Sequence, residues 1–450
     1  MKIAVIGAGI IGVTAARELA ADGHQVTAFE GAGSVAAESS FANPGILSPG
    51  LVTPWSAPGA PARVLRQLLS RTSAVRMPSG AAAASVAWAW RCWRASRSRT
   101  YAANCVRMQR LAYYSREQLH RVTRAMSLDY ERSDGCLMLL RTPDDLARAQ
   151  HALSMLRASR TRFEVLDAAR CREVEPALNP QAPLHAGIHL PDDEVGNCRQ
   201  FANLLRAEAQ RLGVHFQFHT RVQKIVAGSR PELVSIYAPP EEDSMPMAGP
   251  DGDASGQAQD TRPMVRVPVS ESFDAVIVCA ALGTRQLLRP HGLKLPLLAV
   301  HGHSITAPLR TGDAHPDPGP RSAVIDERHD VTICRLGRRV RVAGGVEIGG
   351  SSARHDSATL DTLYKVLDDW FPGCARLGQA QTWKGARPML PDGPPIVGHS
   401  GIAGVWLNVG HGSNGWALAC GSARLLTDLL AGRPPGIDTD GLGVERLKGQ

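Results

Sequence analysis

The sequence predicts an α/β protein in which a doubly wound dinucleotide-binding domain is interleaved with a second domain built on a β-sheet with helices. Three observations predict this fold class. A glycine-rich turn joins a short apolar strand to a helix at the start of the chain. Strand and helix patterns typical of a nucleotide-binding domain recur only after residue 195. Long inserts separate these pieces of the domain. At 450 residues the chain can form two or three domains with sizeable cores.

Composition excludes several classes of protein. With 44% hydrophobic and 20% charged residues the chain has the balance of a soluble globular protein. No apolar run approaches the roughly 20 residues of a membrane-spanning helix. The nine cysteines are scattered, without a C-x-x-C pair or zinc-ligand spacing. We therefore expect reduced thiols, no metal site and a cytoplasmic location.

Positive charge is concentrated in one segment. The net charge is +8, yet residues 60–132 alone hold 14 arginines against three acidic residues. Trp88, Trp90 and Trp93 lie among these arginines. The segment 85–132 is either a solvated helical region with tryptophans in the core, or a peripheral contact with the inner face of the cell membrane. No nucleic-acid-binding motif accompanies the charge, so we expect no nucleic-acid partner.

The first elements form a dinucleotide fingerprint. A strand over Ile3–Ile6 runs into Gly7-Ala-Gly9-Ile-Ile-Gly12, and a helix with apolar periodicity follows over Val13–Ala21. Gly7 permits the tight turn, Gly9 lets the backbone approach a pyrophosphate, and Gly12 allows close packing of helix and strand. The phosphates are expected at the helix N-terminus, where unpaired N–H groups and the positive end of the dipole meet.

A second strand, Gln25–Phe29, ends in Glu30. Its carboxylate is expected to accept hydrogen bonds from the adenosine ribose hydroxyls, and its charge disfavours the 2′-phosphate of NADP. The fingerprint alone does not separate FAD from NAD.

Later elements complete the nucleotide domain in pieces. A helix is predicted over Asn197–Leu212, a strand over Val214–Phe218, and a buried strand over Phe273–Cys279. Near the end, a strand over Gly404–Gly410 leads into the helix Trp416–Leu430. Such a split domain suits flavoenzymes better than nicotinamide dehydrogenases, whose cofactor domain is usually one block.

Several motifs resemble one family over nearly the whole chain. They are Gly7–Gly12, Ser39–Gly50 (SSFANPGILSPG), Pro54–Gly59, Leu190–Cys198, Gly385–Gly393 (GARPMLPDG), and Gly410-His411-Gly412 followed by Gly415-Trp416 and Cys420-Gly421. In combination they are similar to the small subunit of FAD-dependent D-amino-acid dehydrogenases, within the D-amino-acid oxidase and glycine oxidase group.

The resemblance implies FAD as the cofactor and assigns residues to it. The stretch from Ser39 to Ser48 is expected along the flavin, Val222 at the adenine, and the glycines of His411–Gly415 at the N1–C2=O edge, where a helix N-terminus stabilises negative charge. The expected cofactor contacts are Gly7, Gly9, Ile11, Gly12, Glu30, Ser39, Ser40, Asn43, Gly45, Val222, Ala281, Gly283, Gly410, Gly412, Gly415 and Trp416.

The substrate residues expected by resemblance are Arg387, His303 and His411. An α-carboxylate in an apolar pocket needs a charged bidentate donor, which the Arg387 guanidinium provides. The family carries Lys-Gly-Tyr-Ser where this chain has His301-Gly302-His303-Ser304. His303 thus replaces a pocket tyrosine. Ala281 replaces a common glycine, and residues 238–263, rich in Pro, Gly, Asp and Ser, are expected to form a disordered insertion.

We expect the FAD-binding domain to comprise residues 1–60, 195–295 and 385–435, and the substrate domain to comprise 61–194 and 296–384. The expected function is oxidative deamination of a D-alanine-like D-amino acid to a 2-oxo acid and ammonia. Hydride passes to flavin N5, and electrons go on to a quinone or another electron-transfer partner. Three alternatives stay open: an enzyme of the same fold for D-hydroxyproline, sarcosine or glycine, a non-catalytic flavin-binding subunit, and an NAD-dependent dehydrogenase.

Overall fold

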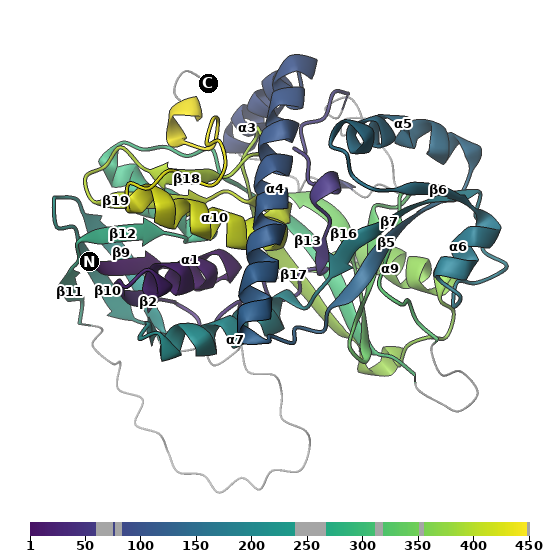
Figure 1. Cartoon of the computed structure of the whole chain (residues 1–450), viewed down its shortest axis with the longest axis horizontal. Coiled ribbons are helices and arrows are strands. Elements are labelled where there is room, and N and C mark those ends of the chain that lie inside the picture. The colour runs from purple at the N-terminus through teal and green to yellow at the C-terminus, as the bar shows by residue number, and fades with distance from the viewer. Residues whose placement is uncertain (60–74, 77–82, 239–266, 311–317, 351–354, 448–450) are drawn as a thin grey trace, which may run out of the picture.

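A computed structural model describes residues 1–59, 75–76, 83–238, 267–310, 318–350 and 355–447. Within these residues, six strands form a sheet in the order β18-β19-β12-β1-β2-β8, which we call the nucleotide sheet (Figure 1). All its neighbours pair in parallel except β18 and β19. Its strands are β1 (Lys2–Ile6), β2 (Gln25–Phe29), β8 (His215–Gln217), β12 (Ala275–Val278), β18 (Ile396–His399) and β19 (Val405–Val409).

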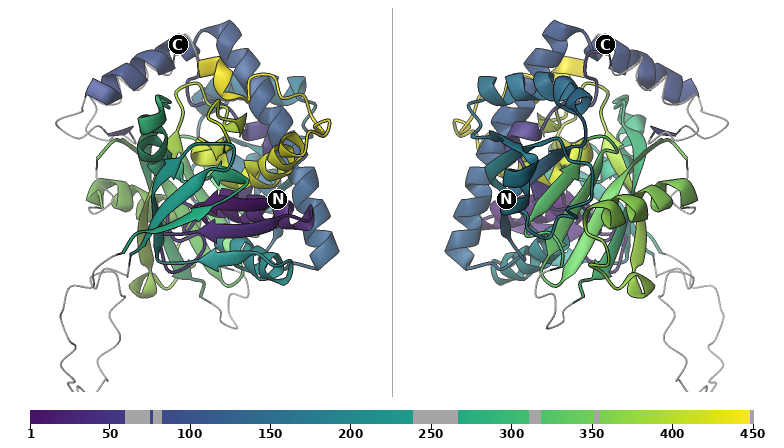
Figure 2. Two further views of the ribbon diagram at one scale, coloured as in Figure 1. Left: turned by 90° about the vertical axis from the view of Figure 1, so that its left-hand side faces the viewer. Right: turned by 90° about the vertical axis from the view of Figure 1, so that its right-hand side faces the viewer.

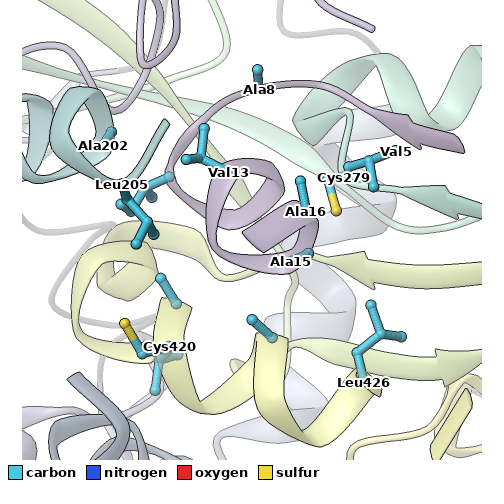
Figure 3. Close-up of a cluster of buried hydrophobic side chains, with 14 of the residues drawn as sticks. Val5, Ala8, Val13, Ala15, Ala16, Ala202, Leu205, Cys279, Cys420 and Leu426 are labelled. Carbon is cyan, nitrogen blue, oxygen red and sulfur yellow. The ribbon is translucent and has the colours of Figure 1, made fainter. Parts of the chain in front are cut away.

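Three helices cover one face of the nucleotide sheet. They are α1 (Ile10–Ala21), α7 (Cys198–Arg211) and α10 (Gly415–Leu430). Figure 3 shows Val13 and Ala16 of α1, Leu205 of α7 and Leu426 of α10 in one apolar cluster, which also includes Val5 of β1. The small side chains of α1 allow the close approach, since the helix has alanine at four of its twelve positions.

The other face of the nucleotide sheet carries a three-stranded sheet in the order β11-β10-β9. Its strands are β9 (Thr220–Val226), β10 (Glu232–Tyr237) and β11 (Val269–Ser272). The helix α8 (Thr284–Leu288) packs against β9. A second apolar core lies between this three-stranded sheet and the nucleotide sheet.

A second, larger sheet lies beside the nucleotide sheet (Figure 1). In the described part of the chain its order is β17-β13-β16-β15-β14-β5-β7-β3, with β4 on β16 and β6 on β7. Its strands are β3 (Ile46–Leu47), β4 (Val75–Arg76), β5 (Ser133–Leu140), β6 (Glu164–Asp167), β7 (Ala186–Val195), β13 (Leu298–Pro308), β14 (Ala323–Asp326), β15 (Val331–Leu336), β16 (Arg339–Ile348) and β17 (Gln381–Met389).

Helices pack around the large sheet. The helix α9 (Ser357–Trp370) covers β13 and β16 through a core that includes Ile305, Val342 and Trp370. The helix α6 (Ala168–Val174) adds Cys171 to the same core, whereas α5 (Pro143–Ala158) packs on the opposite face of the sheet, in a core with Cys136 and Leu140.

Two helices come from the Arg-rich segment. The 29-residue α4 (Ser98–Met126) packs on α10 and joins the core of the nucleotide sheet. A Cβ on Gly421 of α10 would lie 2.8 Å from the backbone of Ser115, so glycine is needed where these helices cross. The helix α3 (Ala83–Ala95) lies at the periphery of the molecule (Figure 2).

The α/β prediction is confirmed, and the strand Gln25–Phe29 has the predicted bounds. The insertion predicted over 238–263 lies outside the described residues, apart from Ala238. Among the helices described here, none has both the length and the apolar character needed to cross a bilayer. The division of the chain into two domains stays a prediction; α4, expected in the substrate domain, packs with the nucleotide sheet.

Candidate functional site

The turn between β1 and α1 is built for a phosphate group. Gly7 has a φ of +97°, and a Cβ at Gly12 would lie 1.8 Å from the Gly7 carbonyl oxygen, so only glycine closes this turn. A Cβ at Gly9, in contrast, would meet only the Ser40 Oγ, at 3.5 Å. The N-terminus of α1 has no side-chain cap within the described residues, although the Ile10 N–H donates to Ser40 Oγ at 3.2 Å. The N–H groups of a first helical turn lack partners within the helix, and Gly9 and Ile11 line an open space, which fits a diphosphate.

Glu30 lies at the end of β2. Its carboxylate accepts the backbone N–H groups of Ala8 at 2.7 Å and Ala32 at 2.9 Å. Burial raises the pKa of Glu30, and these two hydrogen bonds oppose that shift. Each carboxylate oxygen keeps a further lone pair, which leaves room to accept a ribose hydroxyl. The ribose contact stays a prediction. The Thr220 N–H donates to the Glu30 carbonyl oxygen at 2.8 Å and brings β9, with Val222, beside the end of β2.

A cavity opens above the α1 turn, and its empty space, with the open solvent at its mouth included, is about 990 Å³. Its walls come from both large sheets and from the loop after β2. The predicted site residues that line it are Gly9, Ile11, Ser39, Ser40, Asn43, Ala281, Arg387, His303, Gly410, His411, Gly412, Gly415 and Trp416. The predicted residues outside its walls are Gly7, Gly12, Glu30, Gly45, Val222 and Gly283.

Gly45 has a role in the packing of the loop. It has a φ of +98°, and a Cβ there would lie 2.9 Å from the Gly196 carbonyl oxygen. Its own carbonyl oxygen accepts the Trp416 indole N–H at 3.2 Å, and its N–H donates to Asn43 Oδ1 at 2.8 Å. The contacts seen for Gly45 therefore position Trp416 and Asn43, which line the cavity.

Ala281 also lines the cavity, at the end of β12. Its φ is +46°, in the left-handed region that residues with a Cβ rarely adopt. This backbone conformation explains why glycine is favoured at the position. The chain tolerates alanine there at a cost of about 1–2 kcal/mol.

One wall of the cavity is the strand pair β13–β17. The register pairs Val300 with Arg387, Gly302 with Gly385, and Ser304 with Trp383. Residues two apart share a face of a strand, so Arg387, Gly385 and Trp383 point to the same side. A Cβ on Gly302 would lie 2.1 Å from Arg387 Nη2, so the guanidinium lies directly over this glycine.

Arg387 has no hydrogen bond or ion pair with any residue in the described ranges. Burial lowers the pKa of Arg387, yet the group stays charged at neutral pH. Arg387 is half-buried in the cavity wall, where a guanidinium is stabilised by an anion, so a carboxylate is the ligand that this position fits.

Several buried polar atoms of other residues that line the cavity lack a partner among the described residues. They are His303 Nδ1, Ser304 Oγ, Trp383 Nε1, both amide atoms of Asn408, and His411 Nε2. Each unmade hydrogen bond costs roughly 1–3 kcal/mol. Their concentration around one cavity fits a large ligand with many polar atoms, as FAD and an amino acid together would be.

The histidines predicted as substrate residues differ in their surroundings. His303 lies on the opposite face of β13 from Arg387, because it pairs with Lys384, and its Nε2 accepts the Asp356 N–H at 3.2 Å. Its neutral ring therefore has the proton on Nδ1. Burial, together with the Lys384 ammonium, lowers the pKa of His303 to about 4. The predicted substrate contact of His303 stays a prediction, and the register favours an indirect role.

His411 follows β19 and is buried in the cavity wall. Burial lowers the pKa of His411 to about 3, so the ring is neutral at pH 7. A Cβ on the adjacent Gly410 would lie 2.3 Å from a methyl carbon of Leu390, which explains the glycine at the turn into α10.

Sequence reasoning missed four residues of the site: Gly302, Ser304, Trp383 and Asn408. Two glycines inside strand patterns, Gly302 and Gly385, were a usable signal because interior strand glycines often mark close approach of a ligand or backbone. Asn408 offered no such signal, since a polar residue near a strand end is ordinary.

Comparisons with known proteins agree with this geometry. Residues 2–429 match the DAO family, described as FAD dependent oxidoreductase. A D-amino acid dehydrogenase of Rhizorhabdus wittichii is 38% identical over 449 residues, which cover 99% of this chain and 100% of the relative. One of Cereibacter sphaeroides is 38% identical over 452 residues, covering 99% and 95%. The solved glycine oxidase of Geobacillus kaustophilus is similar in fold, with a TM-score of 0.70 at 18% identity, covering 98% and 97%.

Proposed function

Because the chain belongs to the DAO family of FAD-dependent oxidoreductases, we propose that it oxidatively deaminates a D-amino acid to a 2-oxo acid and ammonia. Full-length relatives named D-amino acid dehydrogenase support this activity. The single observation that carries it is the half-buried Arg387 guanidinium, which has no ion-pair partner among the described residues and lies in the wall of a cavity that begins at the dinucleotide turn.

The chain's own groups would hold the cofactor along this cavity. The N-terminus of α1 binds the diphosphate and Glu30 the ribose. The turn at Gly412–Asn414 and the start of α10 bring N–H groups to the flavin ring. When bound, FAD supplies the acceptor for the hydride that leaves the substrate Cα.

Substrate binding begins with the carboxylate at Arg387, in a bidentate ion pair. Because Gly302 and Gly385 have no side chains, the Arg387 guanidinium and the Trp383 indole lie over this strand pair, where they line the cavity that the substrate enters. No general base is needed, because an amine that enters neutral loses only hydride. His303 and His411 are neutral and contribute no competing positive charge near the amine. Positioning and exclusion of water supply most of the catalysis. The imino acid is then hydrolysed in water.

The reaction requires an electron acceptor, and we propose a quinone in a membrane that the protein meets through α3. Val86, Trp90 and Trp93 lie at i, i+4 and i+7 on one face of α3 and are 64%, 51% and 54% exposed. Arg94 lies over the Trp90 ring, 4.9 Å from its centroid. Exposed tryptophans next to arginines suit the interface of an anionic bilayer.

The buried face of α3 connects this surface to the site. Trp88 donates its indole N–H to the Met389 carbonyl oxygen at 3.3 Å, and the Cys92 thiol contacts the Pro391 carbonyl oxygen at 3.3 Å. Met389 and Pro391 closely follow Arg387 in the chain, so α3 is anchored directly to the strand end that forms the cavity wall.

Anaerobic mixing of the purified protein with a panel of D- and L-amino acids tests the proposal. We expect bleaching of the flavin absorbance by D-amino acids and not by their L-enantiomers. Bleaching only by glycine or an N-methylated amine would assign another amine oxidation to the same fold, and no bleaching by any amine would contradict an enzymatic role.

A further inference from the structure

Trp383 is a further polar group in the wall that holds Arg387. It lies opposite Ser304 in the β13–β17 pair, on the same face as Arg387. A Cβ on Gly385 would lie 3.1 Å from Trp383 Nε1, so the indole N–H lies over the glycine between Trp383 and Arg387. The indole therefore folds back along the strand toward the guanidinium.

The ring of Trp383 is held in this position by its neighbours. It stacks on Phe41, with centroids 4.4 Å apart and an interplanar angle of 28°. The Arg199 guanidinium lies 3.9 Å from the centroid of Phe41 and fixes that ring in turn. The stack leaves Nε1 buried without a hydrogen-bond partner among the described residues. An indole N–H is a donor only, so its missing partner must be an acceptor.

The two donors meet over one pair of glycines. Arg387 Nη2 lies over Gly302 and Trp383 Nε1 lies over Gly385, and these glycines are directly paired in the register. Opposed residues in an antiparallel pair have Cβ positions about 4.5–5.5 Å apart. That spacing suits one small anion held by both donors.

We propose that the Trp383 indole N–H is a second donor to the substrate carboxylate, beside Arg387. This inference rests on the proposed function and deepens it. A carboxylate has about four lone-pair sites, of which a bidentate guanidinium uses two. The indole N–H takes a third.

The arrangement also defines a substrate class. Trp383 and Arg387 offer only N–H donors over the glycine pair, so a carboxylate fits them better than a carboxamide, whose NH₂ group would have to find its acceptor elsewhere, at the Ser304 hydroxyl. The site therefore selects free α-amino acids over amino-acid amides and over peptides joined through that carboxyl group.

Substitution Trp383→Phe removes the N–H and keeps an aromatic ring for Phe41. Benzoate titrated into the FAD-loaded protein, followed by the perturbation of flavin absorbance, measures carboxylate binding without turnover. We expect the Kd of benzoate to rise about 10- to 100-fold, the range for a hydrogen bond to a charged group. The KM for the amino acid should rise with it, while FAD content stays unchanged.

Two control variants and a control ligand test the role of the Trp383 N–H. Trp383→His retains a ring N–H and should bind benzoate more tightly than Trp383→Phe. Trp406→Phe changes a half-buried tryptophan of β19 outside the cavity wall and should leave the Kd unchanged. Benzamide should bind weakly and equally to the wild type and Trp383→Phe.

Each outcome decides the question. Wild-type affinity for benzoate in Trp383→Phe, or loss of FAD from that variant, would overturn the inference and assign Trp383 to packing or to the cofactor. If Arg387→Lys still weakens benzoate while Trp383→Phe does not, the proposed function survives and this inference fails. A wild-type protein that neither binds benzoate nor is bleached by an amino acid refutes the proposed function itself.

Discussion

At the residue scale, Arg387 is where substrate binding can be tested most directly. Arg387→Lys keeps the charge and loses the bidentate geometry, so transition-state binding should weaken by about 2–4 kcal/mol, the range for breaking one partner of a buried charged pair. We expect this loss in kcat/KM, with flavin content nearly unchanged. Loss of flavin with normal kinetics per bound flavin would assign Arg387 to the cofactor or to folding.

A substitution at Gly9 tests cofactor binding without disturbing the fold. A Cβ at Gly9 meets only Ser40 Oγ at 3.5 Å, and its φ of −64° suits any residue. Gly9→Val should therefore fold but fill the space that the pyrophosphate needs, and the protein should purify colourless. The thermal unfolding of wild-type apoprotein is the matched reference, and the variant should unfold within a few degrees of it. A variant that stays yellow at full stoichiometry would contradict the fingerprint assignment.

The histidines of the site predict a simple pH profile. Burial holds the pKa of His303 at about 4 and that of His411 at about 3, so neither gains a proton between pH 5.5 and 8. Of the groups at the cavity, only the substrate ammonium should then titrate, and log(kcat/KM) should rise steadily with pH without an inflection near 6.5. An inflection near 6.5 that His411→Gln abolishes would show that the imidazole titrates during the reaction.

The same shifts have a sign for stability. Below pH 6.5, His303 and His411 bind fewer protons in the folded protein than in the unfolded chain. These two histidines therefore lower the free energy of unfolding as pH falls from about 6.5 toward 4. Asp193 acts oppositely, since burial raises its pKa to about 7, and its contribution falls as pH rises from about 4 to 7.

Residues of the dinucleotide turn were predictable because their chemistry is local. The positive φ of Gly7 and the contact of Gly12 with the Gly7 carbonyl oxygen arise within six residues of chain. Trp383 and Asn408 were not predictable, because a tryptophan or asparagine in a strand is ordinary. What distinguishes them is the missing hydrogen-bond partner, which only the packed structure reveals.

At the element scale, capped helices were predicted well and long-range packing was not. The helix predicted over Asn197–Leu212 is observed over Cys198–Arg211, because Asn197 accepts the Gln200 N–H at 3.2 Å and Gly213 follows with a φ of +90°. The Arg-rich segment gave no sign that α4 packs on α10. That contact depends on a glycine, Gly421, which lies about 300 residues later in the chain.

The helix α3 carries the membrane prediction. Vesicles rich in anionic lipid should bind the protein at low salt, since each basic residue near the surface contributes about 1 kcal/mol. Release is expected near ~0.5 M salt, where the Debye length falls to a few Å. The combined change of Arg91, Arg94 and Arg97 to Ser should weaken the binding measured by sedimentation.

A matched variant distinguishes the electrostatic attraction of the arginines from the insertion of tryptophan side chains into the bilayer. Trp90→Ser with Trp93→Ser leaves the arginines in place and should lower the binding that remains at intermediate salt. If the wild type does not sediment with vesicles at low ionic strength, α3 is a solvated helix and the electrons leave to a soluble partner.

At the scale of the whole molecule, the chain passes repeatedly between the two large sheets. It starts in the nucleotide sheet with β1 and β2, contributes β3, β5 and β7 to the large sheet, and returns with β8 and β12. It then builds β13 to β17 and returns again with β18 and β19. The sequence predicted this interleaving from the three separated nucleotide-domain pieces. The strand order of the large sheet was beyond prediction, because pairs such as β13–β17 join residues about 85 positions apart.

Interleaving predicts cooperative unfolding. Neither sheet is one continuous stretch of chain. The cavity takes Gly9 from the turn after β1 and Arg387 from β17, so ligands stabilise both sheets together. In urea, flavin release and loss of far-UV circular dichroism should follow one transition, and adding benzoate to the FAD-loaded protein should move both curves to higher urea by the same amount. Separate transitions, with benzoate shifting only one of them, would show that the two sheets unfold independently and that the cavity does not couple them.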